Sequence, residues 1–131
     1  MVDLPSPARR IYVDPDGAVY VIGANSVGTW RAGEWRAGPP APDINAFTDA
    51  SAGFSNGKLI VYAVASGAIL ISEDAGATWR RSELQLGSQP QMPAVATSLQ
   101  HPSVAYVSYR VRGGPFGVAK TTDTGAPGNW F

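Results

Sequence analysis

The sequence has no cysteine and a single histidine, His101, among its 131 residues. Without cysteine the chain cannot form disulfides, use a thiolate nucleophile or hold zinc through sulfur. With one imidazole it cannot build a site that needs two. The small disulfide-rich secreted scaffolds are therefore excluded, and we predict neither a metal nor a cofactor.

Charge and long apolar runs are also scarce. Charged residues make up 15% of the chain, and 10 Lys and Arg balance 10 Asp and Glu. Sequence-independent binding to nucleic acid requires a basic surface, so nucleic acid is not a predicted partner. The longest apolar run, residues 59–65, is far shorter than the roughly 20 residues of a membrane span. Residues 1–10 lack the pattern of a signal peptide, and the compartment stays open.

Glycine and proline, in contrast, are abundant, with 15 and 11 copies. Their combined share is roughly twice the average. So many helix breakers leave little room for long helices, which favours an all-β fold with many turns. The apolar fraction of 44% is high enough to form a core.

Three similar segments recur along the chain, centred on Tyr20, Tyr62 and Tyr106, which are 42 and 44 residues apart. Each tyrosine segment is preceded by a turn signal. Each turn is itself preceded by a stretch of alternating apolar residues, at 10–13, 44–49 and 94–99. Two further strands are expected after each tyrosine strand, which makes four strands per unit and twelve in all. A repeat of about 43 residues with four strands is typical of a propeller blade. We place the units at about 9–37, 44–82 and 93–131, within one domain spanning 1–131.

The most distinctive motif is Ser72-Glu73-Asp74-Ala75-Gly76-Ala77-Thr78-Trp79. Asp74 can accept backbone N–H groups within residues 75–78, as short acidic side chains in turns do. Gly76 can adopt a left-handed conformation, and the hydroxyls of Ser72 and Thr78 can close the turn. Trp79 is expected to begin the next strand and to be mostly buried.

A second, wider copy contains Thr121, Asp123 and Gly125, with Trp130 placed two residues later than the pattern requires. We expect Asp123, like Asp74, to be engaged within its turn. The corresponding hairpin of the first unit, residues 29–35, lacks the motif.

The motif at residues 72–79 resembles the Asp-box of the bacterial neuraminidase repeat family, Ser/Thr-x-Asp-x-Gly-x-Thr-Trp, at every defined position. The resemblance implies a sialidase-like or sortilin-like β-propeller of six or seven blades, in which the Asp-box is structural and lies on the rim. Its relatives include sialidases, xyloglucanases, sortilin-type receptors and photosystem assembly factors.

The expected fold is therefore an all-β partial β-propeller of about three four-stranded antiparallel blades, with a plain β-sandwich as the alternative. Three blades do not close a ring. We therefore expect the chain to be a fragment whose partners include the remaining blades of the same protein.

Two functions remain open. The first is a piece of a glycoside hydrolase-type, carbohydrate-active protein that is inactive alone because its catalytic residues lie largely outside this chain. The second is a non-catalytic propeller scaffold whose loops bind a protein or glycan partner. Arg10 lacks the flanking aromatic and proline of the sialidase arginine motif, and the three repeat tyrosines are expected in the core. Trp30 and Trp35 are expected to pack between sheets rather than to bind sugar. The acidic candidates, Asp43, Asp49, Glu73, Asp74 and Glu83, cannot be paired from sequence, so we predict no catalytic residue.

Overall fold

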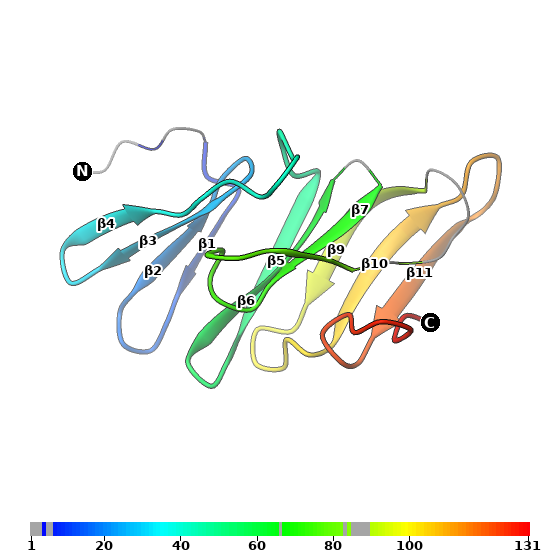
Figure 1. The fold of residues 1–131 in the computed structure, drawn as a ribbon. Coiled ribbons are helices and arrows are strands. Elements are labelled where there is room, and N and C mark those ends of the chain that lie inside the picture. The colour runs from blue at the N-terminus through cyan, green and yellow to red at the C-terminus, as the bar shows by residue number, and fades with distance from the viewer. Residues whose placement is uncertain (1–3, 5–6, 66, 83, 85–89) are drawn as a thin grey trace.

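The computed structural model describes residues 4, 7–65, 67–82, 84 and 90–131. These residues form eleven β-strands in three antiparallel sheets. The sheets lie side by side in chain order, and the two termini are at opposite ends of the row (Figure 1). The described residues include no α-helix, and thus none that could span a membrane.

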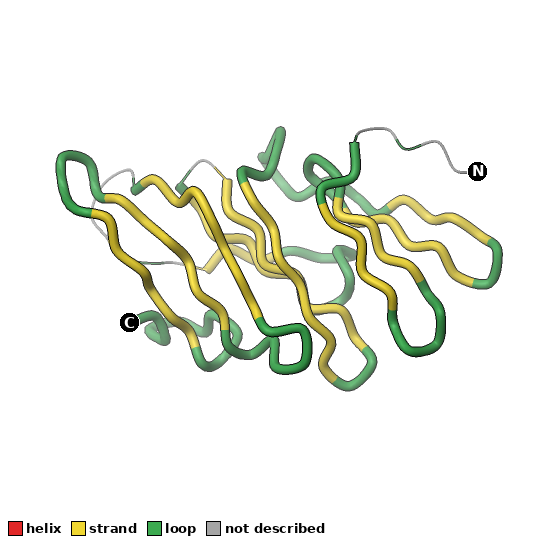
Figure 2. The backbone as a smooth tube through the Cα atoms, turned by 180° about the vertical axis from the view of Figure 1, so that it is seen from behind, coloured by secondary structure: helices red, strands yellow, loops and turns green. Residues whose placement is uncertain are grey.

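Each sheet is a meander in which neighbours in sequence pair with each other (Figure 2). Sheet 1 contains β1 (Arg10–Val13), β2 (Val19–Ile22), β3 (Val27–Arg31) and β4 (Glu34–Ala37). Sheet 2 contains β5 (Asp49–Ser55), β6 (Lys58–Ala65), β7 (Ala68–Ser72) and β8 (Arg80–Ser82). Sheet 3 contains β9 (Gln91–Thr97), β10 (Ala105–Arg110) and β11 (Phe116–Thr121).

The twelfth predicted strand is reduced to an isolated bridge between Thr121 and Trp130. The expected strand at residues 44–49 is also wrong, because pairing of β5 begins only at Asp49. Ile44 and Phe47 are buried three residues apart within a loop, a spacing that suits a turn rather than an alternating strand. The stretch expected at residues 94–99 lies earlier in the chain, since β9 covers Gln91–Thr97.

The core consists of two apolar layers, one on each face of sheet 2. Alternate residues of β6 enter the two layers: Val61 faces sheet 1, whereas Tyr62 faces sheet 3. A strand buried on both faces needs apolar residues at every position, which explains the unbroken apolar run at 59–65. On the outer faces of sheets 1 and 3, apolar side chains are left uncovered by the described residues, with Ile11 62% and Phe116 73% exposed.

The three repeat tyrosines do not share one environment. Tyr20 and Tyr62 are buried, but Tyr106 is 44% exposed. The prediction of a core position for Tyr106 is therefore wrong. In sheet 3 the neighbouring residues Ala105 and Val107 face sheet 2, which turns Tyr106 to the open face, where Lys120 lies over its ring.

Candidate functional site

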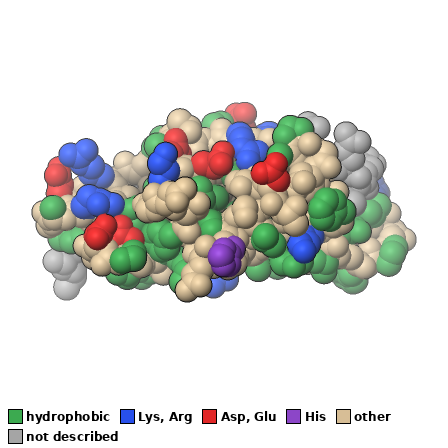
Figure 3. Space-filling model, turned by 90° about the horizontal axis from the view of Figure 1, so that it is seen from below, with side chains coloured by type: hydrophobic (Ala, Val, Ile, Leu, Met, Phe, Trp, Pro, Cys, Tyr) green, Lys and Arg blue, Asp and Glu red, His purple; other side chains and the backbone are tan. Residues whose placement is uncertain are grey.

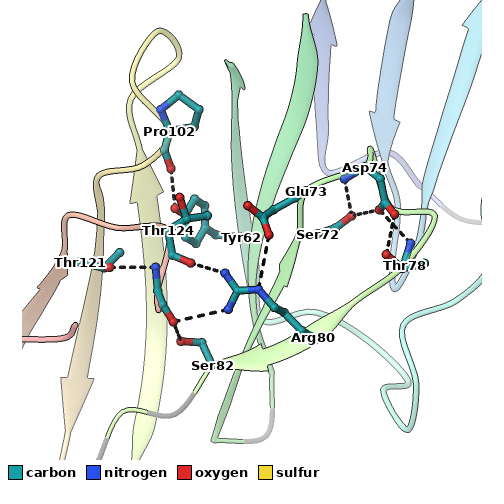
Figure 4. A network of polar contacts seen from close by, with 11 residues as sticks. Tyr62, Ser72, Glu73, Asp74, Thr78, Arg80, Ser82, Pro102, Thr121 and Thr124 are labelled. Carbon is teal, nitrogen blue, oxygen red and sulfur yellow. Dashed lines mark hydrogen bonds and ion pairs between the residues drawn. The ribbon is translucent and has the colours of Figure 1, made fainter. Parts of the chain in front are cut away.

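The turn between β7 and β8, residues 72–79, is closed by its own side chains; we call it the Asp74 turn. The Asp74 carboxylate accepts hydrogen bonds from the Ser72 hydroxyl and the Thr78 N–H, both at 2.8 Å, and from the Thr78 hydroxyl (Figure 4). The Ser72 oxygen in turn accepts the N–H of Gly76 at 2.8 Å. The sequence-based expectation for the Asp74 carboxylate agrees with this geometry. Trp79 is partly buried and packs against the core, but it precedes β8 rather than beginning it.

These contacts set the acidity of Asp74. Partial burial alone would raise its pKa, but hydrogen bonds from Thr78 and Ser72 outweigh burial and lower the pKa below the ordinary value. Donors to the charged form favour ionisation. The carboxylate therefore stabilises the fold above its ordinary pKa, and this contribution is lost as the pH falls through the lowered value.

We expect Asp74→Ala to lower the free energy of unfolding by about 1–2 kcal/mol, the usual cost of losing a local cap or a charge-assisted hydrogen bond. Urea denaturation at pH 7 measures the loss. Repeating the titration toward pH 3 should narrow the gap between wild type and variant. A gap that stays constant with pH would show that the Asp74 charge is not what stabilises the turn.

The second motif, residues 121–130, is closed differently; we call it the Asp123 turn. The Thr121 hydroxyl oxygen accepts the Gly125 N–H at 2.8 Å, as Ser72 does for Gly76. The acceptor that closes the turn, however, is the Asn129 side-chain oxygen, which binds the Thr121 hydroxyl and the Thr122 N–H at 2.8 Å each. The Asp123 carboxylate has no hydrogen bond or ion pair with any described residue. The expectation for Asp123 is therefore wrong, because the two extra residues bring Asn129 into the position of the carboxylate. Asp123→Ala is accordingly the matched, near-silent control for Asp74→Ala.

Each turn docks on the preceding sheet through its glycine. Gly76 has a φ of +85°, and a Cβ at that position would lie 2.7 Å from the Cβ of Val27 in sheet 1. Gly125 has a φ of +64°, and its Cβ would lie 2.4 Å from Ile71 Cδ1 and 2.8 Å from Ser82 Oγ in sheet 2. A side chain at either position would therefore meet both backbone strain and the neighbouring sheet.

Polar contacts join sheets 2 and 3 at the Asp123 turn (Figure 4). The Ser82 hydroxyl donates to the Gly125 carbonyl at 2.6 Å and accepts the Trp130 indole N–H at 2.8 Å. Arg80 donates to the carbonyls of Thr124 and Gly125 and pairs with Glu73 at 3.6 Å. The equivalent indole N–H, on Trp79, is buried without a hydrogen-bond partner among the described residues. The interface between sheets 2 and 3 is thus more polar than the interface between sheets 1 and 2.

Tyr62 completes this junction from within the core. Its side chain is fully buried, and its hydroxyl donates to the Pro102 carbonyl. Burial disfavours the charged phenolate and raises the pKa of Tyr62 to about 12. A raised acid pKa contributes stability that is fully present below about pH 10 and is lost as the pH rises toward 12.

We therefore expect a fall of about 2–3 kcal/mol in the free energy of unfolding between pH 10 and pH 12 from ionisation of Tyr62 alone. Denaturant titrations of wild type and Tyr62→Phe between pH 10 and pH 12 separate the effect of Tyr62 ionisation from other alkaline effects, because the variant has no phenol at that position. Parallel pH profiles of the two proteins would refute the assignment.

Two grooves follow the outer strands. One, of about 640 Å³, lies between β4 and the Asp74 turn and is lined by residues that include Arg31, Arg36 and Asp74. The other, of about 620 Å³, lies between β8 and β11 beside the Asp123 turn; we call it the β8–β11 groove. It is lined by Arg80, Arg81, Ser82, Leu84, Tyr109, Val118, Ala119, Gly125, Pro127, Gly128, Trp130 and Phe131. Acidic and basic side chains are intermingled on the face seen from below (Figure 3).

Of the other sequence candidates, Arg10, Asp49, Trp30 and Trp35 have structural contacts, whereas Asp43 is exposed in a loop with a φ of +61°. Arg10 lies 3.8 Å from Asp49, whose carboxylate also accepts the Val95 N–H. Trp30 and Trp35 are cross-strand partners in sheet 1, and the Trp35 ring covers Gly28 so closely that a Cβ there would clash. Glu83 lies outside the described residues. Among the described residues no three His, Asp or Glu side chains are grouped as metal ligands.

No model of a known protein family matches the sequence, and no curated protein matches it. A solved structure described as "YCF48 bound to D1 peptide" matches 99% of this chain with a TM-score of 0.58 and 19% sequence identity. YCF48 is a β-propeller protein. The fold is a partial β-propeller. The three sheets are its blades, and the chain spans 41% of the length of that solved structure. At this identity the likeness establishes the fold and nothing finer.

Proposed function

We propose that the chain contributes three consecutive blades to a non-catalytic propeller scaffold that binds a protein partner. The observation that carries the proposal is the match over 99% of the chain to a propeller whose structure contains a bound peptide. That peptide is a property of YCF48; for this chain we infer only the class of ligand, a segment of polypeptide.

The acidic side chains support a scaffold over a glycoside hydrolase. The Asp14 carboxylate accepts the N–H groups of Asp16 and Ala18 within its hairpin. Asp49 and Glu73 are paired with arginines, and Asp74 closes its turn. Retaining and inverting glycosidases both need two carboxyl groups facing one cleft. The carboxylates of Asp14, Asp49, Glu73 and Asp74 have structural partners instead.

The open faces of the end blades fit the same proposal. Ile11 and Val13 on blade 1 are 62% and 61% exposed, and Val118 on blade 3 is 63% exposed. Apolar side chains also fill the two buried layers between blades 1 and 2 and between blades 2 and 3. We infer that further blades cover both ends, and that the Asp74 and Asp123 turns act as Asp-boxes that fasten each blade to the one before it.

The function is tested by selecting peptides from a random display library on the immobilised chain. The selected peptides are then titrated against the chain in solution. We expect saturable binding that scrambled peptides lose. Fluorogenic glycosides, sialosides among them, are assayed in parallel and are expected to show no turnover. Turnover that persists through repurification, with no saturable peptide, would favour the hydrolase and overturn the proposal.

A further inference from the structure

The linker between β4 and β5, residues 38–48, is buried at every third residue. It crosses from blade 1 to blade 2 along the upper side of the row in Figure 1. The residues that face the protein are partly or fully buried and are Gly38, Ala41, Ile44 and Phe47, whereas all the residues between them are exposed. A period of three fits neither a strand nor an α-helix. It is the period of polyproline II, which has three residues per turn.

Prolines hold the first part of the linker, residues 38–42, in this conformation; we call this part the proline segment. The rings of Pro39, Pro40 and Pro42 fix the φ angle of each residue near −65°. A following proline also restricts the residue before it to extended backbone, and this applies to Pro39 and Ala41. No helix, strand or turn is assigned between residues 38 and 41. Sequence and structure therefore agree on a polyproline II segment.

Two backbone hydrogen bonds fasten the proline segment to blade 1. The Gly38 N–H donates to the Val27 carbonyl at 2.9 Å, and the Ala41 N–H donates to the Asn25 carbonyl at 2.8 Å. Ala41 is also only 2% exposed and belongs to the core layer between blades 1 and 2. The segment is thus ordered before any partner binds, which lowers the entropy cost of binding.

The proline segment turns two of its three ridges outward. Because three residues complete a turn, Pro39 and Pro42 share one ridge and Pro40 lies on the second, while Gly38 and Ala41 form the ridge that faces the protein. All three prolines are exposed. The carbonyl oxygens of Pro39 and Pro40 accept no hydrogen bond from any described residue. Exposed proline ridges with free carbonyl acceptors are the features that aromatic-lined grooves of polyproline-binding domains recognise.

Arg36 adds a positive charge just before the proline segment. Its side chain is 79% exposed, and its ion pair with Glu34, at 3.6 Å, is formed with an equally accessible carboxylate. Exposed pairs of this kind are weak, so a partner's carboxylate can compete for the guanidinium. Arg36 and Pro39 both line the groove between β4 and the Asp74 turn. The arrangement favours a partner whose aromatic groove carries acidic residues at one end.

We propose that the proline segment is a preformed ligand for a protein domain with an aromatic-lined, partly acidic polyproline-binding groove. Pro39 and Pro42 would enter the groove, and Arg36 would meet its acidic end. The inference goes beyond the proposed function, because here the chain presents the bound segment instead of binding one. Neither interaction requires the other.

The test measures the binding of a panel of recombinant SH3, WW and EVH1 domains to the whole ¹⁵N-labelled chain. We expect a domain with an acidic groove to bind and to shift the amide signals of Gly38, Ala41 and Asp43. A blocked peptide with the sequence of residues 36–42 should bind the same domain about tenfold more weakly, because its ends are free. Binding to the peptide but not to the chain, or to neither, would overturn the proposal.

Two sets of variants locate the interaction. Pro39→Ala and Pro42→Ala should each weaken binding of the domain about tenfold, because each removes a ring and a fixed φ angle from the outer ridge. Pro15→Ala changes an exposed proline in the turn between β1 and β2 and should leave binding unchanged. Arg36→Ala should weaken binding about threefold at low salt, whereas Arg112→Ala, in the exposed loop before β11, should not. The ¹⁵N spectrum of each variant reports whether it remains folded.

The outcomes separate this proposal from the proposed function. If library-selected peptides bind the chain but none of the domains does, the scaffold function stands and the proline-segment proposal is overturned. If a domain binds but the Ala41 amide loses its protection from exchange, the partner has detached the segment from blade 1. The segment would then not be a preformed ligand, and the proposal would be overturned.

Discussion

Gly125→Ala is expected to lower the free energy of unfolding by about 2–5 kcal/mol. The left-handed φ of +64° costs a residue with a Cβ about 1–2 kcal/mol. The new methyl group would also lie 2.4 Å from Ile71 Cδ1 and 2.8 Å from Ser82 Oγ, and overpacking of this kind costs about 1–3 kcal/mol. The loss would fall on the contact between blades 2 and 3.

Gly128→Ala, in the same turn, provides the control. Gly128 also has a positive φ, +76°, but a Cβ there would meet no atom within 4 Å. This variant should therefore show only the backbone strain, about 1–2 kcal/mol. Urea denaturation of both variants separates strain from docking. Equal losses would mean that the Asp123 turn does not hold blade 3 against blade 2.

Tyr62→Ala is expected to cost about 3–5 kcal/mol, the usual range for deleting a fully buried aromatic side chain. Tyr62 is fully buried and belongs to the core layer between blades 2 and 3. Tyr106→Ala changes the corresponding residue of the third repeat, which is 44% exposed. Because little apolar contact is lost there, we expect a cost below about 1 kcal/mol.

Tyr62→Phe separates the contribution of the hydroxyl group from that of the aromatic ring. It keeps the ring but leaves the Pro102 carbonyl without the hydroxyl that donates to it, which should cost about 1–3 kcal/mol. Thermal and urea denaturation of the three variants give the comparison. Similar losses in Tyr62→Ala and Tyr106→Ala would contradict the assignment of the two tyrosines to different faces.

The two interfaces between blades share one construction. A glycine of the turn between the third and fourth strands approaches the preceding blade, and an adjacent backbone N–H anchors the same turn to its own blade: Ala75 donates to Leu59 and Thr124 to Ser103. In blade 1 the corresponding hairpin is a tight turn with Ala32 and Gly33 at positive φ. It lacks the residues that fasten the other two turns.

Features that depend on neighbours along the chain could be predicted from the sequence. Glycine and proline content, a period of two and the spacing of the tyrosines predicted an all-β repeat. The closure of the Asp74 turn was predictable because the hydrogen bonds of the Ser72 and Asp74 side chains lie within residues 72–79, and local hydrogen bonding follows from residue type and spacing.

Features that depend on a neighbouring blade could not be predicted in this way, because they require contacts between residues far apart in the chain. Tyr106 lies on the outer face of blade 3, because its neighbours Ala105 and Val107 face blade 2, although its strand resembles those of the two buried tyrosines. Asn129 displaced Asp123 as the acceptor because the wider turn changed which side chain reaches Thr121. The contacts of Arg80 and Ser82 with the Asp123 turn join residues 43 to 45 positions apart.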